Sequence, residues 1–255
     1  MSDARRAILD PRMDAPEFEL NLALDVAALS RRFASCGRLQ IGDFLTADSA
    51  ALLSSHLQQS DRWRHVFNSA ERTIELPSND WDTAAEVTRR PILQAIDEAA
   101  AFDFQYQYDN IRVPDGADDR ARSETLLDRF AIFLSSEAVL DTLMQITGSR
   151  DLTFADCQAT RYRSGDFLTP HNDELEGMNR RFAYVLSLTH DWLPRWGGLL
   201  HFVDAKGGVD ETIAPRFNAL SLFAIGQSHY VSQVATYAPI PRISVTGWLR
   251  TKAPA

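Results

Sequence analysis

The part of the sequence that most restricts the fold begins at Asp151, where short apolar or alternating runs follow one another, separated by turn residues. The runs are LTFADCQATRY, RFAYVLSLT, GLLHFVDA, ALSLFAI, HYVSQV and RISVTGWLR. A parallel sheet needs crossover helices between its strands, and no helical pattern separates these runs. Short strands at this spacing therefore predict a sandwich, jelly roll or barrel.

The preceding half is mainly helical in pattern, with some short strands. Apolar periodicity and capping residues predict helices over 22–33, from Thr46 or Asp48 to 59, over 88–101, and two within 124–148 that are separated near 135–136. Short strands are expected at 37–44, 63–66 and 72–76. Phe102, Phe104, Tyr106 and Tyr108 alternate with polar residues, as in a half-buried strand whose apolar face packs in the core.

The polar stretch 109–123 contains Pro and Gly and predicts a long loop, of the kind that is often a mobile lid or a disordered segment. No linker or repeat divides the chain, so we expect one domain over 1–255. Its fold class is α+β, with a double-stranded β-helix (jelly-roll) core at about 151–251 and supporting helices at about 20–150.

Charge and cysteine content limit the possible partners and the compartment. The formal net charge of −9 argues against broad electrostatic binding to nucleic acid or to an anionic membrane. Cys36 and Cys157 form no CxxC pair, so neither a disulfide framework nor a cysteine zinc site is expected. Because the chain also has no long apolar run and no signal-like start, we expect a cytoplasmic protein.

A candidate metal site begins at His171-Asn172-Asp173. In an extended segment residues i and i+2 point to the same side, so His171 and Asp173 can approach one ion. His229 opens a later strand and offers a third ligand. Two histidines and one carboxylate form the facial triad of non-haem Fe(II) oxygenases, and the same residues also suit zinc. The alternative is a surface histidine beside an acidic turn.

Arg242 and Ser244 lie two residues apart on the last predicted strand. An arginine that faces into an apolar barrel needs a buried anion, and its planar fork suits a carboxylate. The alternative is an exposed strand arginine. In a zinc hydrolase that used the triad as its metal site, Arg242 and Ser244 would have no function.

Four ordered segments together resemble a known family. RYRSGDFLTPHND, WGGLLHF, ALSLFAIGQSHYVSQV and RISVTGWLR resemble the 2-oxoglutarate and Fe(II)-dependent oxygenases of the prolyl hydroxylase type. Within that group they look most similar to the branch that hydroxylates a proline of a ribosomal small-subunit protein. That branch commonly carries a second, non-catalytic barrel, and we expect this chain to contain the catalytic domain alone.

The resemblance implies a role for individual residues. His171, Asp173 and His229 would bind iron, while Arg242, supported by Ser244, and Tyr162 would bind 2-oxoglutarate. Ser187 occupies the place where relatives often carry a further tyrosine. Residues that could contact the substrate lie on the last strand and around the site: Trp248, Arg250, Arg161, Arg163, Arg180, Arg181 and Arg195.

The expected activity is hydroxylation of a prolyl residue in a protein, with Fe(II), 2-oxoglutarate and O₂, and with ascorbate as a candidate reductant. Succinate and CO₂ would be the co-products. The partner would be a proline-containing protein or peptide, with no direct role for nucleic acid or membrane. Two alternatives stay open: hydroxylation of a small molecule such as a free amino acid, and an inactive barrel that acts as a binding module.

Overall fold

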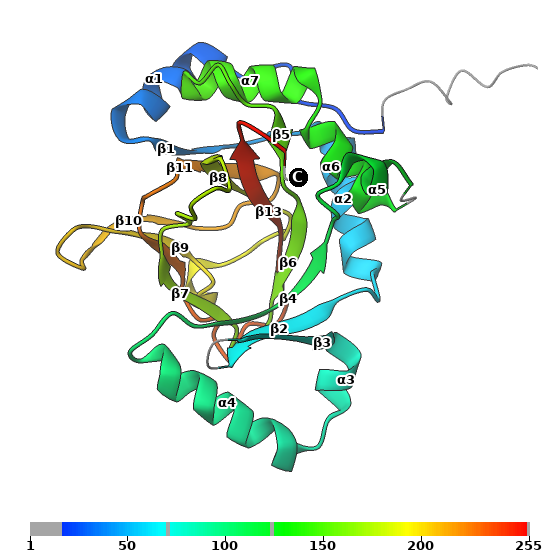
Figure 1. Cartoon of the computed structure of the whole chain (residues 1–255), viewed down its shortest axis with the longest axis vertical. Coiled ribbons are helices and arrows are strands. Elements are labelled where there is room, and N and C mark those ends of the chain that lie inside the picture. Colours follow the sequence, from blue (N-terminus) through cyan, green and yellow to red (C-terminus); the bar gives the residue numbers. More distant parts are fainter. Residues whose placement is uncertain (1–16, 70–71, 123–124, 254–255) are drawn as a thin grey trace, which may run out of the picture.

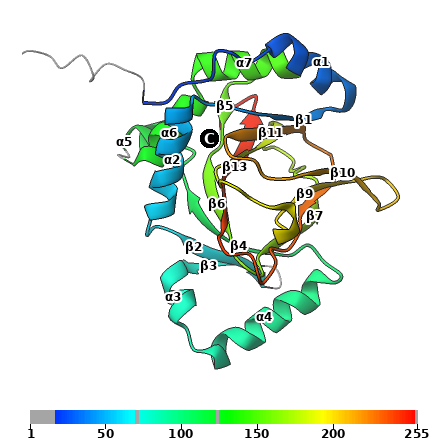
Figure 2. The ribbon, with the colours of Figure 1, turned by 180° about the vertical axis from the view of Figure 1, so that it is seen from behind.

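A rolled antiparallel sheet forms the centre of the computed structural model, which describes residues 17–69, 72–122 and 125–253. Its strands are β1 (Arg38–Ile41), β2 (Arg64–Ser69), β3 (Arg72–Pro77), β4 (Tyr106–Arg112), β5 (Phe154–Ala155), β6 (Gln158–Tyr162), β7 (Phe167–His171), β8 (Arg180–Ser187), β9 (Leu200–Val203), β10 (Val209–Ile213), β11 (Ala219–Ala224), β12 (His229–Val231) and β13 (Arg242–Arg250). Ten of these strands follow the order β1-β11-β8-β13-β6-β4-β7-β12-β9-β10 and enclose a barrel-like space (Figures 1 and 2), while β2, β3 and β5 pair outside this path. The expected α+β class with a jelly-roll core is confirmed.

The N-terminal half contributes strands to this sheet as well as helices. β1 pairs with β11, and β4 lies between β6 and β7. β2 joins β4 and carries β3 as an outer strand. The picture of a helical half packed on a separate β half is therefore incomplete, because the early strands complete the barrel.

The prediction of a long loop at 109–123 is largely wrong. Residues Asp109–Arg112 continue β4, and α5 (Ala117–Arg122) follows after a short connection; Ser123 lies outside the described residues. Asp109 is polar but completely buried, where it forms an ion pair with Arg161 of β6 and a hydrogen bond with His65. The polar residue at the start of this stretch, Asp109, thus belongs to a buried network of charged side chains and not to a lid.

The helices are α1 (Val26–Cys36), α2 (Ala47–Gln59), α3 (Ser78–Thr83), α4 (Glu86–Ala100), α5, α6 (Leu126–Leu134) and α7 (Glu137–Thr147), with a 3₁₀ turn at Pro194–Trp196. Thr46 caps α2 by accepting a hydrogen bond from the Ser49 N–H, and Gly148 ends α7 at a φ of 74°. Figure 1 shows α1 and α7 at one end of the molecule and α3 and α4 at the opposite end.

One face of the sheet packs against helices and the other encloses a cavity. Leu186 of β8, Leu222 of β11 and Val245 of β13 share a core cluster with apolar residues of α2, α6 and α7. Because side chains alternate along a strand, their neighbours point to the inside of the barrel. This alternation directs the candidate site residues inwards.

The apolar helices α6 and α7 contribute several residues to that core, among them Phe130 and Leu143. In the described ranges no single helix is long and apolar enough to cross a membrane. Among the described helices, α6 and α7 meet the required length and composition only when taken together, with a bend of 51° between them. Burial in the core explains their apolar character.

Candidate active site

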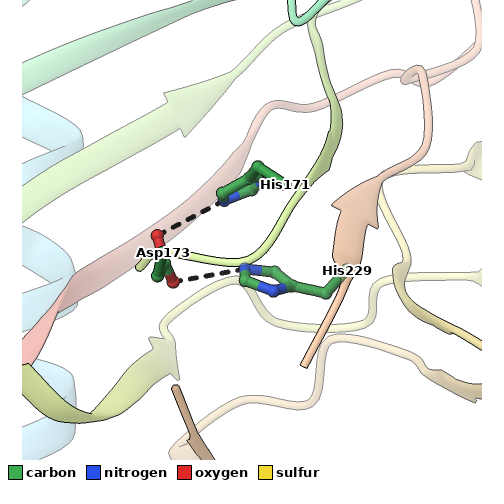
Figure 3. A group of neighbouring side chains, drawn as sticks. All are labelled: His171, Asp173 and His229. Carbon is green, nitrogen blue, oxygen red and sulfur yellow. Dashed lines mark ion pairs between the residues drawn. The ribbon is translucent and has the colours of Figure 1, made fainter. Parts of the chain in front are cut away.

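Strand pairing brings the three predicted metal ligands together. His171 ends β7 and His229 begins β12, and the two residues are opposite each other in the antiparallel register. Their Nε2 atoms lie 3.5 Å and 3.4 Å from the two carboxylate oxygens of Asp173. Figure 3 shows both rings pointing at this carboxylate. One ligand atom from each residue falls within 4.8 Å of the others, which is the arrangement a single metal ion needs.

Backbone carbonyls fix the orientation of both rings. Nδ1 of His171 lies 3.0 Å from the Thr169 carbonyl, and Nδ1 of His229 lies 2.9 Å from the Gln227 carbonyl. Each Nδ1–H therefore donates to the backbone and leaves the Nε2 lone pair directed at the site. Burial and the neighbouring His171 lower the pKa of His229 to about 4, so its ring is neutral near pH 7, as metal binding requires.

Arg242 lines the same cavity, which has a volume of about 230 Å³. It is 2% exposed and lies opposite Tyr162 in the β13–β6 register. Its Nε has no hydrogen-bond partner, and no carboxylate among the described residues lies within ion-pair distance of it. Burial lowers the pKa of this guanidinium. An unpaired buried cation is costly, so the cavity is complementary to an anion such as a carboxylate.

Two stacked tyrosines form one wall of the cavity. The rings of Tyr108 and Tyr162 are 5.1 Å apart, and the Arg242 guanidinium carbon lies 5.2 Å from the centre of the Tyr162 ring. Burial raises the pKa of Tyr108 to about 12 and raises that of Tyr162 further, so both hydroxyls remain protonated donors. The sequence assigned Tyr108 to the core. The alternation of Tyr106 and Tyr108 was the available signal, because both residues line this cavity.

Ser244 lies behind the cavity wall. It is completely buried, and its Oγ is 2.9 Å from Oγ1 of Thr160. Thr160 lines the cavity, whereas Ser244 is not among the lining residues. Any support that Ser244 gives to a bound carboxylate would therefore pass through Thr160 or the Arg242 strand.

Some of the predicted substrate arginines lie away from the cavity and others lie closer to it. Arg161 of β6 and Arg163, which directly follows β6, alternate with Tyr162 along the chain and form ion pairs with the buried Asp109. This placement does not support a role in substrate binding, since both side chains are directed away from the cavity. Arg181 pairs with Asp151 at the surface, and the Arg195 carbonyl accepts a hydrogen bond from Tyr237.

Arg180, Trp248 and Arg250 lie closer to the cavity. Trp248 lines it, and the guanidinium carbon of Arg180 lies 3.5 Å from the centre of a Trp248 ring. Arg180 also donates a hydrogen bond of 3.2 Å to the carbonyl of the candidate ligand Asp173. Arg250 instead pairs with Asp156 at 2.6 Å, beyond Trp248. Trp248 and Arg180 therefore border the site directly.

Residues 157–250 match a family model described as the 2OG-Fe(II) oxygenase superfamily. This range contains the two histidines, Asp173 and Arg242, in the order and geometry described above. Residues 157–250 are therefore those of a 2OG-Fe(II) oxygenase domain. For this oxygenase domain, the family and the triad together imply Fe(II) and 2-oxoglutarate, and the unpaired Arg242 fits a dicarboxylate.

Individual proteins similar to this oxygenase domain include prolyl hydroxylases. The chain is 35% identical over 100 residues to "Prolyl 3-hydroxylase OGFOD1" of Xenopus laevis, which covers 36% of this chain and 19% of that relative. The chain thus spans about a fifth of the length of this relative. A prolyl-4-hydroxylase of Pseudomonas putida has a TM-score of 0.58 at 21% identity, covering 89% of this chain and 99% of that one.

A prolyl hydroxylase of Trichoplax adhaerens, solved with a peptide fragment of the hypoxia inducible factor oxygen degradation domain, has a TM-score of 0.57 at 16% identity. The match covers 89% of both chains. At these identities the two structures establish a shared fold.

Proposed function

We propose that the protein is an Fe(II)- and 2-oxoglutarate-dependent dioxygenase that hydroxylates a prolyl residue of a protein or peptide. One observation carries the proposal: a histidine-aspartate-histidine triad and an unpaired buried arginine line one cavity. In the balanced reaction, one atom of O₂ enters a C–H bond as hydroxyl. The other enters succinate as 2-oxoglutarate loses CO₂.

The residues of the cavity act as binders rather than as acids or bases. His171 and His229 offer Nε2, and Asp173 offers a carboxylate oxygen, which leaves coordination positions open. Fe(II) and 2-oxoglutarate, when bound, supply the oxidising chemistry. Arg242 would hold the distal carboxylate of 2-oxoglutarate, with the Tyr162 hydroxyl as a second donor. Apolar side chains such as Leu168, Phe223 and Val231 keep water away from the site.

Three observations favour a prolyl substrate. The relative described above is a prolyl 3-hydroxylase, and the fold neighbour from Trichoplax adhaerens holds a peptide. In this chain Phe104, Tyr106 and Trp248 add aromatic surface to the cavity lining, and Phe104 is 47% exposed. Flat aromatic faces suit the compact, apolar proline ring.

Addition of Fe(II) and 2-oxoglutarate to the protein without oxygen should produce a weak visible charge-transfer band. Comparison of the host proteome with and without the gene should then reveal a proline that loses one oxygen atom of mass. Restoring the gene should restore this mass, and restoring it with Asp173→Asn should not. A spectrum that does not change at saturating 2-oxoglutarate would contradict the cofactor assignment.

Replacement of Arg242 with Ala should weaken 2-oxoglutarate binding about tenfold to a hundredfold, as expected for the loss of a charge-assisted pair. Metal binding should change little, because Arg242 is not one of the clustered ligands. Titration of the Mn(II)-loaded protein with 2-oxoglutarate measures the first quantity, and Mn(II) titration alone the second. Arg242→Lys keeps the charge without the planar fork, so its affinity for 2-oxoglutarate should lie between those of the unaltered protein and Arg242→Ala. Equal loss of both affinities would instead indicate a folding defect.

A further inference from the structure

A second cavity of about 410 Å³ adjoins the active-site cavity. Among the residues that line it are Asp156, Gln158, Met178, Arg180, Trp248 and Arg250, and we call it the side cavity. Gln158 and Trp248 line both cavities and form part of the wall between them. The side cavity therefore lies directly beside the active-site cavity.

Three buried polar atoms of side-cavity residues have no hydrogen-bond partner. They are the acceptor Oδ1 of Asp156 and two donors, Nε of Arg180 and Nε1 of Trp248. Buried polar groups in native proteins almost always have partners, and an unmet group commonly marks the place of a ligand or water. The side cavity thus offers one free acceptor and two free donors.

The free acceptor is held in a fixed orientation. Arg250 Nε donates to Oδ2 of Asp156 at 2.6 Å, and Arg250 Nη1 donates to the Met178 carbonyl at 3.0 Å. Asp156 is 6% exposed and Arg250 is 3% exposed. One carboxylate oxygen is therefore used within the protein and the other is left for a ligand.

The donors are linked to the metal site. Arg180 stacks on Trp248, and its Nη1 donates to the carbonyl of Asp173. These contacts hold the Arg180 guanidinium between the side cavity and a candidate metal ligand. A group bound to these two donors would thus lie next to the active-site cavity.

Charge restricts what can bind there. The cavity lining contains charges of both signs: a carboxylate would be repelled by Asp115 and Asp156, and an ammonium group would face Arg112, Arg180 and Arg250. A neutral group that carries both a donor and an acceptor satisfies all three atoms. In a peptide that group is an amide, either of the main chain or of an Asn or Gln side chain.

We propose that the side cavity binds an amide group of the substrate chain, adjacent to the residue that is hydroxylated. Asp156 Oδ1 accepts the amide N–H, while Trp248 Nε1 and Arg180 Nε donate to the amide oxygen. Asp156 is then a specificity-determining residue. This inference rests on the proposed peptide substrate.

The decisive variant is Asp156→Asn. The Asn oxygen can still accept from Arg250, but the second position then carries a donor in place of the free acceptor. The matched control is Asp151→Asn, which makes the same change in an exposed aspartate–arginine pair with Arg181. Thermal melting of both variants checks that the fold is retained.

The probe is a library of randomised peptides with one fixed central proline, selected on the immobilised full chain with and without Mn(II) and 2-oxoglutarate. The best binders of the unaltered protein should bind Asp156→Asn about tenfold more weakly and Asp151→Asn unchanged. Enrichment of Asn or Gln beside the proline identifies a side-chain amide. Loss of affinity when one peptide N–H is replaced by an ester oxygen identifies a main-chain amide.

Trp248→Phe provides a second variant, since it keeps an aromatic ring and removes the indole donor. It should weaken the same binders several-fold. The proposal is overturned if Asp156→Asn binds these peptides as the unaltered protein does, or if selection yields acidic or basic neighbours or no binders. The charge-transfer band of the protein with Fe(II) and 2-oxoglutarate is measured separately; its absence would count against the proposed function and not against the binding selection.

Discussion

Replacement of Asp173 with Ala should abolish Fe(II) binding and succinate formation, with a loss of metal affinity of at least about a hundredfold. The carboxylate lies between the two histidine Nε2 atoms, and it is the only anionic member of the triad. Without it, two neutral imidazoles would have to hold a divalent cation in a largely buried place. Titration with Fe(II) or Mn(II) under anaerobic conditions measures the affinity.

The backbone at Asp173 calls for a second substitution. Its φ is 62°, in the left-handed region that aspartate and asparagine tolerate better than alanine. Asp173→Asn keeps this preference and the side-chain shape while it removes the charge. Glu174→Ala serves as the control, because Glu174 is the next carboxylate along the chain and bonds Asn172 instead. If Asp173→Asn bound metal as well as Glu174→Ala does, Asp173 would not be a ligand.

The candidate metal site could be predicted from sequence because local geometry determines most of it. The i, i+2 spacing of His171 and Asp173 needs only an extended segment, and His229 needs only a strand that pairs with that segment. The same alternation of side chains along β6 predicts that Arg161 and Arg163 point away from the site. If Tyr162 faces the cavity, then Arg161 and Arg163 must face away from it, as they do.

The parts that sequence missed depend on contacts between distant residues. β1 lies within the strand predicted at 37–44, but its pairing with β11, far along the chain, was not predicted. β10 is exposed along most of its length, so it has no apolar alternation to reveal it. His65 and Asp109 lie 44 positions apart and meet only because β2 pairs with β4. No spacing rule connects such residues, and the side cavity depends on contacts of the same kind.

Replacement of Asp109 with Asn should lower the free energy of unfolding by about 3 kcal/mol, at the lower end of the range for breaking a buried ion pair. Asp109 is completely buried and accepts hydrogen bonds from Arg161 at 2.8 Å and Arg163 at 3.0 Å. His65 also bonds it at 3.0 Å. The lower end applies because the two arginine side chains are 20% and 27% exposed, so water partly solvates them once the carboxylate is gone.

Asp82→Asn is the matched control for this loss. Asp82 pairs with Arg163 at 2.6 Å, but its side chain is 48% exposed. Exposed pairs contribute about 0–1 kcal/mol, so this variant should change stability little. Denaturant titration with an unchanged slope measures both effects. Similar losses in the two variants would mean that burial of Asp109 does not set its contribution.

The pH dependence of stability gives an independent check on Asp109. Burial raises the pKa of its carboxyl, but the hydrogen bond with His65 and the charges of Arg163 and Arg161 outweigh burial and hold the pKa below its ordinary value. A carboxyl whose pKa is lower in the folded state stabilises the fold above its unfolded pKa and loses that contribution on further acidification. The stability difference between the unaltered protein and Asp109→Asn should therefore shrink as the pH falls below about 4. A difference that persisted unchanged in acid would show that the shape of the side chain, and not its charge, holds Arg161 and Arg163 on the outer face of β6.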